Sequence, residues 1–419
     1  MTTYSIEFAK HILLQFGVIL AVGSSCAVLS KKLKIPDVVT FLLVGTLLGP
    51  GGLGWIDIKA DSALNQLLLI FGSCYLLFDG GVSMRFRVIQ EVWVTIVSLA
   101  TAGVLITAAI TGLAAHVFLG LPFLVALLLA SVIASTDPAT LIPVFRQVRV
   151  KDRVSQTVMS ESAFNDATGA ILTFSVLGVA MGTGQFSLQA AALELVHQAL
   201  LGLVAGALLG YLAATLIAHE RYGFLQEYAP LVSLMAVIAA YLGASGLHAS
   251  GFMAVFVFGF MVGNKELFGF EMKEGEQERM DDFVETTSLI MRMFIFFLLG
   301  SQVDFALINQ YFLGGIGVVV VLMLVARPIT VFVCALPDRR ARWSIEELLF
   351  ICWTRETGVI PGALAGLMLG VGAPQARLIS SVTFLAILVT ILTQATTTRW
   401  LAGRLGLLEA SAPAEAASR

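Results

Sequence analysis

The sequence predicts an all-α polytopic membrane protein with about thirteen transmembrane helices. Three observations support this prediction. The chain of 419 residues is 58% hydrophobic and only 13% charged, whereas soluble domains average about 25% charged residues. Its apolar residues form long runs, and a helix that crosses a bilayer needs about 20 of them. Lys and Arg are concentrated in short segments between these runs, as in other helical membrane proteins.

The apolar runs define the expected spans in order. They cover residues 11–30, 36–50, 62–79, 92–114, 121–145, 155–181, 190–218, 228–243, 246–263, 283–301, 311–334, 345–370 and 376–402. The second and eighth runs are short, so a count of about twelve stays open. We expect a single transmembrane domain over residues 1–408 and a short tail at 409–419.

Basic residues mark every second loop. Lys or Arg residues follow the first, third, fifth, seventh, ninth and eleventh expected spans, whereas the opposite loops hold only Lys10, Lys59 and Arg377. Because basic loops stay on the cytoplasmic side, we expect an N-terminus outside, a C-terminus inside and an odd number of spans. The expected location is the cell membrane of a prokaryote. The longest polar connection, residues 264–282, is expected to be a solvated cytoplasmic loop, and a regulatory role for it stays open.

Composition and motifs argue against several other classes. There is no basic face for nucleic acid. The four cysteines are scattered through apolar segments without CxxC or Cys/His spacing, which favours neither a disulfide framework nor a zinc site. Neither a P-loop nor a dinucleotide-binding motif stands in a strand–helix context. We therefore expect no cofactor and no enzymatic activity.

Two expected spans contain residues that interrupt helices. The fifth contains ASTDPATLIP, with Asp137 and Pro138 near its middle, and the twelfth contains TRETGVIPGALAG, with Arg355 and Glu356. Pro and Gly weaken a helix, and the freed backbone groups can face a cavity but not lipid. The two spans run in opposite directions, so spans four to six and eleven to thirteen form inverted triplets. Matching interruptions in inverted halves predict a transporter binding site near the midplane.

The sixth expected span carries the polar segment SESAFNDATGAI. Glu161 and Asn165 are four residues apart, as are Ser162 and Asp166, so the four share an arc of about 140° on one helix face. Carboxylate, hydroxyl and carbonyl oxygens are hard ligands that suit an alkali cation, and no His or Cys set supports a transition metal. This face is therefore a candidate cation site.

The two acids of this segment are expected to differ in role. A buried carboxylate binds protons readily, and a cation competes for the same oxygen atoms, so Asp166 is the candidate for cation–proton exchange. The alternative is that Asp166 only pairs with an arginine. A charge at mid-bilayer costs about 2.5–3.5 kcal/mol, and we expect Glu161 to be neutralised by Arg355. Asn165 is expected to orient the cavity as a neutral hydrogen-bonding group.

These segments together resemble a known family. SESAFNDATGAI, the preceding TDP, ARPITVF in the eleventh span and the arginine of the twelfth resemble monovalent cation–proton antiporters of the NhaP type, and LLFDGGVSM and MFIFFLLG add to the similarity. The resemblance implies an NhaA-like inverted-repeat fold, a homodimer in the lipid membrane and an elevator-like movement. The implied units are core helices at about 92–181 and 311–402, dimerisation helices at about 11–79 and 228–301, and a linker helix at about 190–218.

The resemblance also implies roles for individual residues. Asp166 would be the carboxylate shared by cation and proton, and Asp137, Ser162 and the Thr136 carbonyl would help to coordinate Na⁺ or K⁺. The pairing of Asn165 with Asp166, in place of two aspartates, implies electroneutral exchange of one H⁺ for one Na⁺, K⁺ or Li⁺.

Two features depart from the family pattern. The family surrounds the arginine of its twelfth span with glycine, whereas this chain places Glu356 directly after Arg355. We expect Glu356 to neutralise Arg292 or Arg327, with a change of ion choice as the alternative. Arg292 stands where electrogenic relatives carry a lysine. Because arginine does not release its proton, we expect a structural role for it.

Other functions stay open at this stage. An organic-anion transporter of the same architecture, coupled to Na⁺, could hold its substrate at helix N-termini and clamp it with Arg355. A channel leaves no motif by which the sequence could exclude it. A membrane-embedded enzyme is disfavoured because neither HExxH nor a usable GxSxG is present.

Overall fold

Helices are the regular elements of this chain. The computed structural model describes residues 2–33, 35–136, 141, 145, 148–182, 188–220 and 222–408, and it holds no extended strand in this part of the chain. Nine of the described helical stretches are long and apolar enough to cross a membrane. The protein is therefore an integral membrane protein, and the predicted all-helical class is confirmed.

The long helical stretches coincide with predicted spans. They are α1 (Thr2–Leu33), α3 (Ala63–Val82), α4 (Phe86–Ser98) with α5 (Val104–Leu119), α8 (Asp152–Ala180), α9 (Leu188–Ala218), α10 (Ala229–Gly246), α12 (Glu274–Ser301), α13 (Phe305–Val321) with α14 (Arg327–Ala335), and α17 (Ala376–Thr390) with α18 (Thr396–Arg404). The shorter helices are α2 (Asp37–Leu48), α6 (Phe123–Val132), α11 (Gly251–Gly263), α15 (Ile345–Trp353) and α16 (Val359–Gly370).

Three of the long stretches contain a π-helical turn. These turns are η1 (Leu99–Gly103), η4 (Leu322–Ala326) and η5 (Ile391–Ala395), and they join α4 to α5, α13 to α14 and α17 to α18. A π turn carries an extra residue and is frequent at functional sites. Two of the three occupy the predicted fourth and eleventh spans, which are corresponding members of the predicted inverted triplets.

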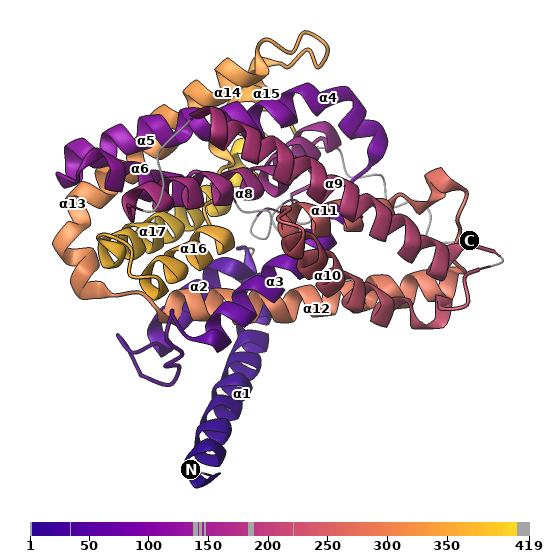
Figure 1. Ribbon diagram of the computed structural model, residues 1–419, viewed down its shortest axis with the longest axis horizontal. Helices are drawn as coiled ribbons and strands as arrows, with labels where there is room; N and C mark the ends of the chain where they lie inside the picture. Colours follow the sequence, from indigo (N-terminus) through magenta and orange to yellow (C-terminus); the bar gives the residue numbers. More distant parts are fainter. Residues whose placement is uncertain are drawn as a thin grey trace.

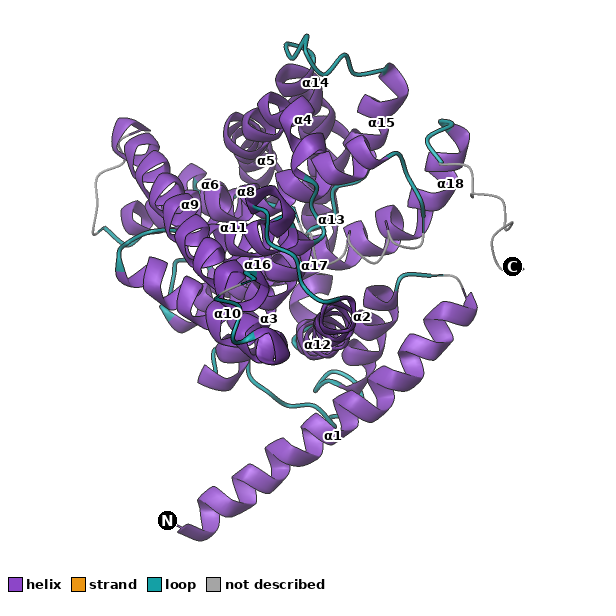
Figure 2. Cartoon of the chain, turned by 90° about the vertical axis from the view of Figure 1, so that its right-hand side faces the viewer, coloured by secondary structure: helices purple, strands orange, loops and turns teal. Residues whose placement is uncertain are grey.

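Two groups of helices occupy opposite sides of the molecule. In both views α4, α14 and α15 lie together at one side and α2, α3 and α12 at the other, while α1 extends away from the bundle (Figures 1 and 2). The described residues also form two short 3₁₀ turns, η2 (Gln226–Tyr228) and η3 (Lys265–Phe268).

Glycines bring the backbones of α2 and α12, and of α3 and α11, into contact. A Cβ atom added at Gly45 of α2 would lie 2.5 Å from the carbonyl oxygen of Phe297 in α12. One added at Gly259 of α11 would lie 2.4 Å from the carbonyl oxygen of Phe78 in α3. Small residues at membrane helix interfaces permit such close approach. These two pairs are therefore packed backbone to backbone, with no room for a side chain.

Loops that the charge pattern assigns to one side of the membrane contact one another. Arg85, before α4, forms an ion pair of 2.9 Å with Asp152 at the start of α8. Arg153 donates a hydrogen bond of 2.6 Å to the carbonyl of Ala341, in the loop between α14 and α15. Contacts between these loops agree with the predicted alternation of basic and non-basic connections.

The loops assigned to the other side also meet. Lys59, Asp304 and Arg377 line one cavity of about 740 Å³, which is bordered by the connections from α2 to α3 and from α12 to α13. Two of the three basic residues of that side, Lys59 and Arg377, are thus neighbours in the fold.

Candidate functional site

Two non-helical segments meet at the centre of the polar cluster. Helix α6 ends at Val132, and the chain continues through residues 133–136 without helical structure. Helix α15 ends at Trp353 and α16 begins at Val359, so residues 354–358 between them are also not helical. Both segments fall within the predicted fifth and twelfth spans.

Arg355 joins these two segments. Its Nη2 atom donates hydrogen bonds of 3.0 Å and 2.7 Å to the carbonyl oxygens of Ile133 and Ala134, and its side chain is fully buried. The last carbonyls of a helix have no partner within the helix, and a cation near this end is favoured by the helix dipole. The end of α6 is therefore neutralised by an arginine from the other interrupted span.

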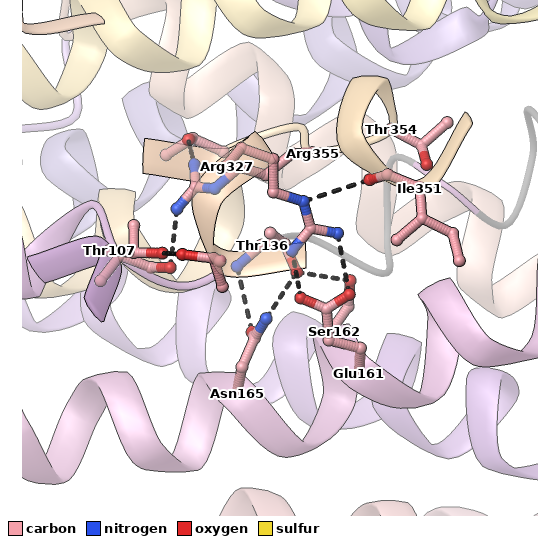
Figure 3. A network of polar contacts seen from close by, with 12 residues as sticks. Thr107, Thr136, Glu161, Ser162, Asn165, Arg327, Ile351, Thr354 and Arg355 are labelled. Carbon is pink, nitrogen blue, oxygen red and sulfur yellow. Dashed lines mark hydrogen bonds and ion pairs between the residues drawn. The ribbon is translucent and has the colours of Figure 1, made fainter. Parts of the chain in front are cut away.

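Asn165 of α8 holds the end of the first segment. Its Oδ1 atom accepts a hydrogen bond of 3.0 Å from the backbone N–H of Thr136, and its Nδ2 atom donates one of 2.8 Å to the Thr136 hydroxyl. That hydroxyl lies 2.6 Å from the hydroxyl of Ser162, one turn earlier on α8. Figure 3 shows Ser162 and Asn165 pointing from α8 toward Thr136. Three of the predicted site residues are thus in direct contact.

Glu161 forms an ion pair with Arg327, not with Arg355 as predicted. Two hydrogen bonds of 2.5 Å and 2.8 Å join the guanidinium to the two carboxylate oxygens, and both side chains are only 2% exposed. A third bond of 3.1 Å runs from the Arg327 Nε to the carbonyl of Ile351 near the end of α15. The prediction failed because Arg355 instead donates to the carbonyls of Ile133 and Ala134, just after the end of α6, and a sequence pattern does not reveal such backbone partners.

Glu356 lies in the second non-helical segment and is fully buried. The structure shows other carboxylates at the two arginines that were predicted to pair with Glu356. Arg327 pairs with Glu161, and Arg292 of α12 lies 3.5 Å from the carboxylate of Asp37 at the start of α2. Arg292 thus joins two helices, as its predicted structural role requires.

Asp166 follows Asn165 on α8 and is buried, with 1% of its surface exposed. It lies one turn after Ser162, on the face that also carries the contacts to Thr136. Asp137, the remaining predicted cation ligand, and Pro138 of the predicted interruption lie outside the described residues. Within the described ranges, no cluster of three or more His, Cys, Asp or Glu side chains is suited to a metal ion. The carboxylate and hydroxyl oxygens on this face are hard ligands, which favour hard cations over soft ones.

Two further interactions were not predicted. The threonine hydroxyls of Thr107 in α5 and Thr330 in α14 lie 3.1 Å apart, and they join the spans that carry η1 and η4. The second is the ion pair of Arg327 with Glu161, because no sequence pattern distinguishes Arg327 from the other buried arginines as the partner of Glu161. The available signal was its position directly before Pro328 in the middle of an apolar run.

Interrupted helices that meet around buried charges define the class of secondary transporters with broken helices. The chain belongs to the sodium/hydrogen exchanger family, whose transmembrane family model matches residues 17–404. The predicted membership of the monovalent cation–proton antiporter superfamily is thereby confirmed.

Individual relatives are similar along most of the chain. Na(+)/H(+) antiporter 1 of Methanocaldococcus jannaschii is 32% identical over 360 residues, which cover 83% of this chain and 81% of that protein. The K(+)/H(+) antiporter NhaP of Alkalimonas amylolytica is 30% identical over 91% of this chain, but the match spans only 64% of its own length. The solved structure of the sodium proton antiporter MjNhaP1 from M. jannaschii at pH 8 has a TM-score of 0.78, with 29% identity, and the match covers 94% of this chain and 99% of that one.

Proposed function

We propose that this protein exchanges Na⁺, K⁺ or Li⁺ for H⁺ across the cell membrane. The observation that carries the proposal is the contact between α8 and the end of α6, where Asn165 and Ser162 hold Thr136 beside the buried Asp166. The relatives named above, described as Na⁺/H⁺ and K⁺/H⁺ antiporters, support the same assignment.

Asp166 is the proposed shared carrier. Its carboxylate binds either the proton or the cation, and each excludes the other because both need the same oxygen atoms. Ser162, Asp137 and the Thr136 carbonyl complete the proposed cation site with neutral and charged oxygen ligands. Asn165 and Arg355 act as positioning residues that fix the two non-helical segments around this site.

The ion pair of Glu161 with Arg327 is proposed to be structural. Both charges are fully compensated by a bidentate contact, so neither is needed to balance the cation. One titratable carboxylate then moves one proton for each cation, which predicts electroneutral exchange. Glu356 is an additional buried acid that this exchange mechanism does not use.

The proposed architecture has thirteen spans. The nine long stretches and four shorter apolar helices supply that number, with α6 and α16 as parts of the two crossing spans. The π turns at corresponding places in the fourth and eleventh spans support an inverted repeat. We propose a homodimer in which helices at 11–79 and 228–301 form the contact, helices at 92–181 and 311–402 move as the core, and 190–218 links the two. We propose a cytoplasmic C-terminus and an N-terminus outside, because basic loops tend to stay on the cytoplasmic side.

Proteoliposomes with an acidic lumen test the exchange directly. Addition of external Na⁺, K⁺ or Li⁺ should dissipate the proton gradient, and Asp166→Asn should abolish this response. Asp282→Asn, at an exposed acid of the 264–282 connection, is the matched control and should retain full activity. Full activity of Asp166→Asn would defeat the proposed carrier. An imposed membrane potential should leave the rate unchanged, and a rate that follows the potential would exclude electroneutral exchange.

The alternative of an organic-anion transporter has less support. It requires a free arginine to clamp the substrate, but the Arg355 guanidinium donates to the carbonyls of Ile133 and Ala134. Uptake of a labelled organic anion that depends on Na⁺ would favour this alternative.

A further inference from the structure

Gln394 is a buried amide that the proposed exchange mechanism does not use. Its side chain is fully buried, and within the described part of the chain neither its Nε2 nor its Oε1 atom has a hydrogen-bond partner. An unsatisfied buried polar group costs about 1–3 kcal/mol. It also lies in η5, a π turn of the kind that is frequent at functional sites. Both facts point to a ligand that the amide binds.

Two hydrogen bonds place Gln394 beside the second non-helical segment. The indole N–H of Trp353 donates to the Thr397 hydroxyl over 2.8 Å, and the backbone N–H of Thr357 donates to the Thr390 hydroxyl over 3.0 Å. The pairs run in opposite directions along the two segments. Gln394 lies between Thr390 and Thr397, so it lies beside the residues between Trp353 and Thr357.

Glu356 lies within that stretch. Its neighbour Arg355 extends to the carbonyls at the end of α6, whereas Glu356 itself is fully buried. On the other flank of Gln394, Ile391 and Ala395 belong to the apolar cluster formed with α2 and α12. Gln394 therefore lies where η5 meets those two helices, beside the non-helical segment that contains Glu356.

We propose that Glu356 and Gln394 form a second site for a monovalent cation, separate from the site at Asp166. The Glu356 carboxylate supplies the negative charge and the Gln394 Oε1 a neutral oxygen ligand, the donor types that hard cations prefer. Bound water completes the coordination, as it does in many polar sites. The proposal rests on the proposed cation exchange, to which it adds a second position on the ion's route.

The Asp166→Asn variant isolates the second site. In the purified full-length variant, we expect Na⁺ or K⁺ to raise the melting temperature in a saturable way, relative to choline at equal ionic strength. Adding Glu356→Gln or Gln394→Leu to this variant should abolish the response or raise its half-saturating concentration at least tenfold. Thr396→Val, at an exposed residue of the same helix, is the matched control and should change nothing.

Each outcome decides the proposal. Absence of any cation-specific stabilisation in Asp166→Asn would overturn it, as would an unchanged response after either added substitution. Gln394→Leu removes an unsatisfied amide and should therefore fold. It tests the proposal even if Glu356→Gln fails to fold. Exchange by Asp166→Asn in proteoliposomes tests the proposed function separately. Retained exchange would refute Asp166 as the carrier, but it would not change the cation-dependent melting temperature that tests the second site.

Discussion

The ion pair between Glu161 and Arg327 gives a sharp test of how the buried charges stabilise the protein. Arg327→Met leaves the Glu161 carboxylate without its bidentate partner, and Glu161→Gln leaves the guanidinium without a counter-charge. Both side chains are only 2% exposed, and removal of one partner from a buried pair costs about 3–5 kcal/mol. Since each 1.4 kcal/mol is tenfold, the folded fraction should fall between about a hundredfold and a few thousandfold relative to the unfolded one.

Replacing both partners should cost much less. The variant Glu161→Leu/Arg327→Met removes both charges together, and apolar substitutes for buried ion pairs are often nearly neutral. The Ile351 carbonyl then loses its bond from Arg327, which costs about 1 kcal/mol. The double variant should therefore be more stable than either single variant, and the coupling energy should exceed about 2 kcal/mol.

Equilibrium unfolding in mixed detergent micelles measures these free energies. The ion pair of Arg85 with Asp152 is the matched control because its side chains are 71% and 49% exposed. Exposed pairs contribute about 0–1 kcal/mol, so Arg85→Met should have little effect. Single variants at Glu161 and Arg327 that stay within about 1 kcal/mol of the parent, or whose effects simply add in the double variant, would refute the reasoning.

Three further predictions concern other parts of the molecule. Arg355→Met should lower the exchange rate at least tenfold, and Arg355→Lys should restore it only in part, because lysine lacks the forked guanidinium. Exchange rates in proteoliposomes test this, and equal rates for the parent and both variants would contradict it. Gly259→Ala should destabilise the folded protein by about 1–3 kcal/mol, because the added Cβ would lie 2.4 Å from the Phe78 carbonyl oxygen. Gly243→Ala is the control and should not destabilise it, because a Cβ there meets nothing within 4 Å; thermal unfolding compares the two variants. Burial lowers the pKa of Lys265 below its ordinary value of 10.5, so between the folded-state and the unfolded-state pKa the unfolded protein binds more protons, and stability should rise with pH. Thermal unfolding measured against pH should lose this slope in Lys265→Met, and an unchanged slope would count against the argument.

Much of the fold could be predicted because lipid imposes simple rules. The apolar runs located the helices, and the spacing of basic residues predicted which loops meet, as the contact of Arg85 with Asp152 illustrates. Helical periodicity also placed Ser162 and Asn165 on one face of α8, and both contact Thr136. These features depend on local sequence or on a bilayer-wide constraint, so a single sequence is sufficient to predict them.

The partners of the buried arginines could not be predicted in the same way. Arg292, Arg327 and Arg355 are chemically equivalent in the sequence, and their choice among acids depends on how the helices pack. Arg355 is bound by carbonyls that become free only where α6 ends, and backbone groups leave no trace in side-chain patterns. Gln394 could not be predicted either, because a single amide in an apolar run forms no recognisable motif.

The glycine contacts of α2 with α12 and of α3 with α11 have a consequence for how the sequence can vary. At Gly45 and Gly259 the backbone of the neighbouring helix occupies the space of the first side-chain atom. No rotamer or compensating neighbour can relieve that contact, so every substitution there meets the same obstacle. Around α8, by contrast, a lost charge can be matched by a second change at its partner. The polar residues around α8 should therefore diverge by coordinated pairs of substitutions. The contacts of α2 with α12 and of α3 with α11 should keep their glycines, or the helices should move apart.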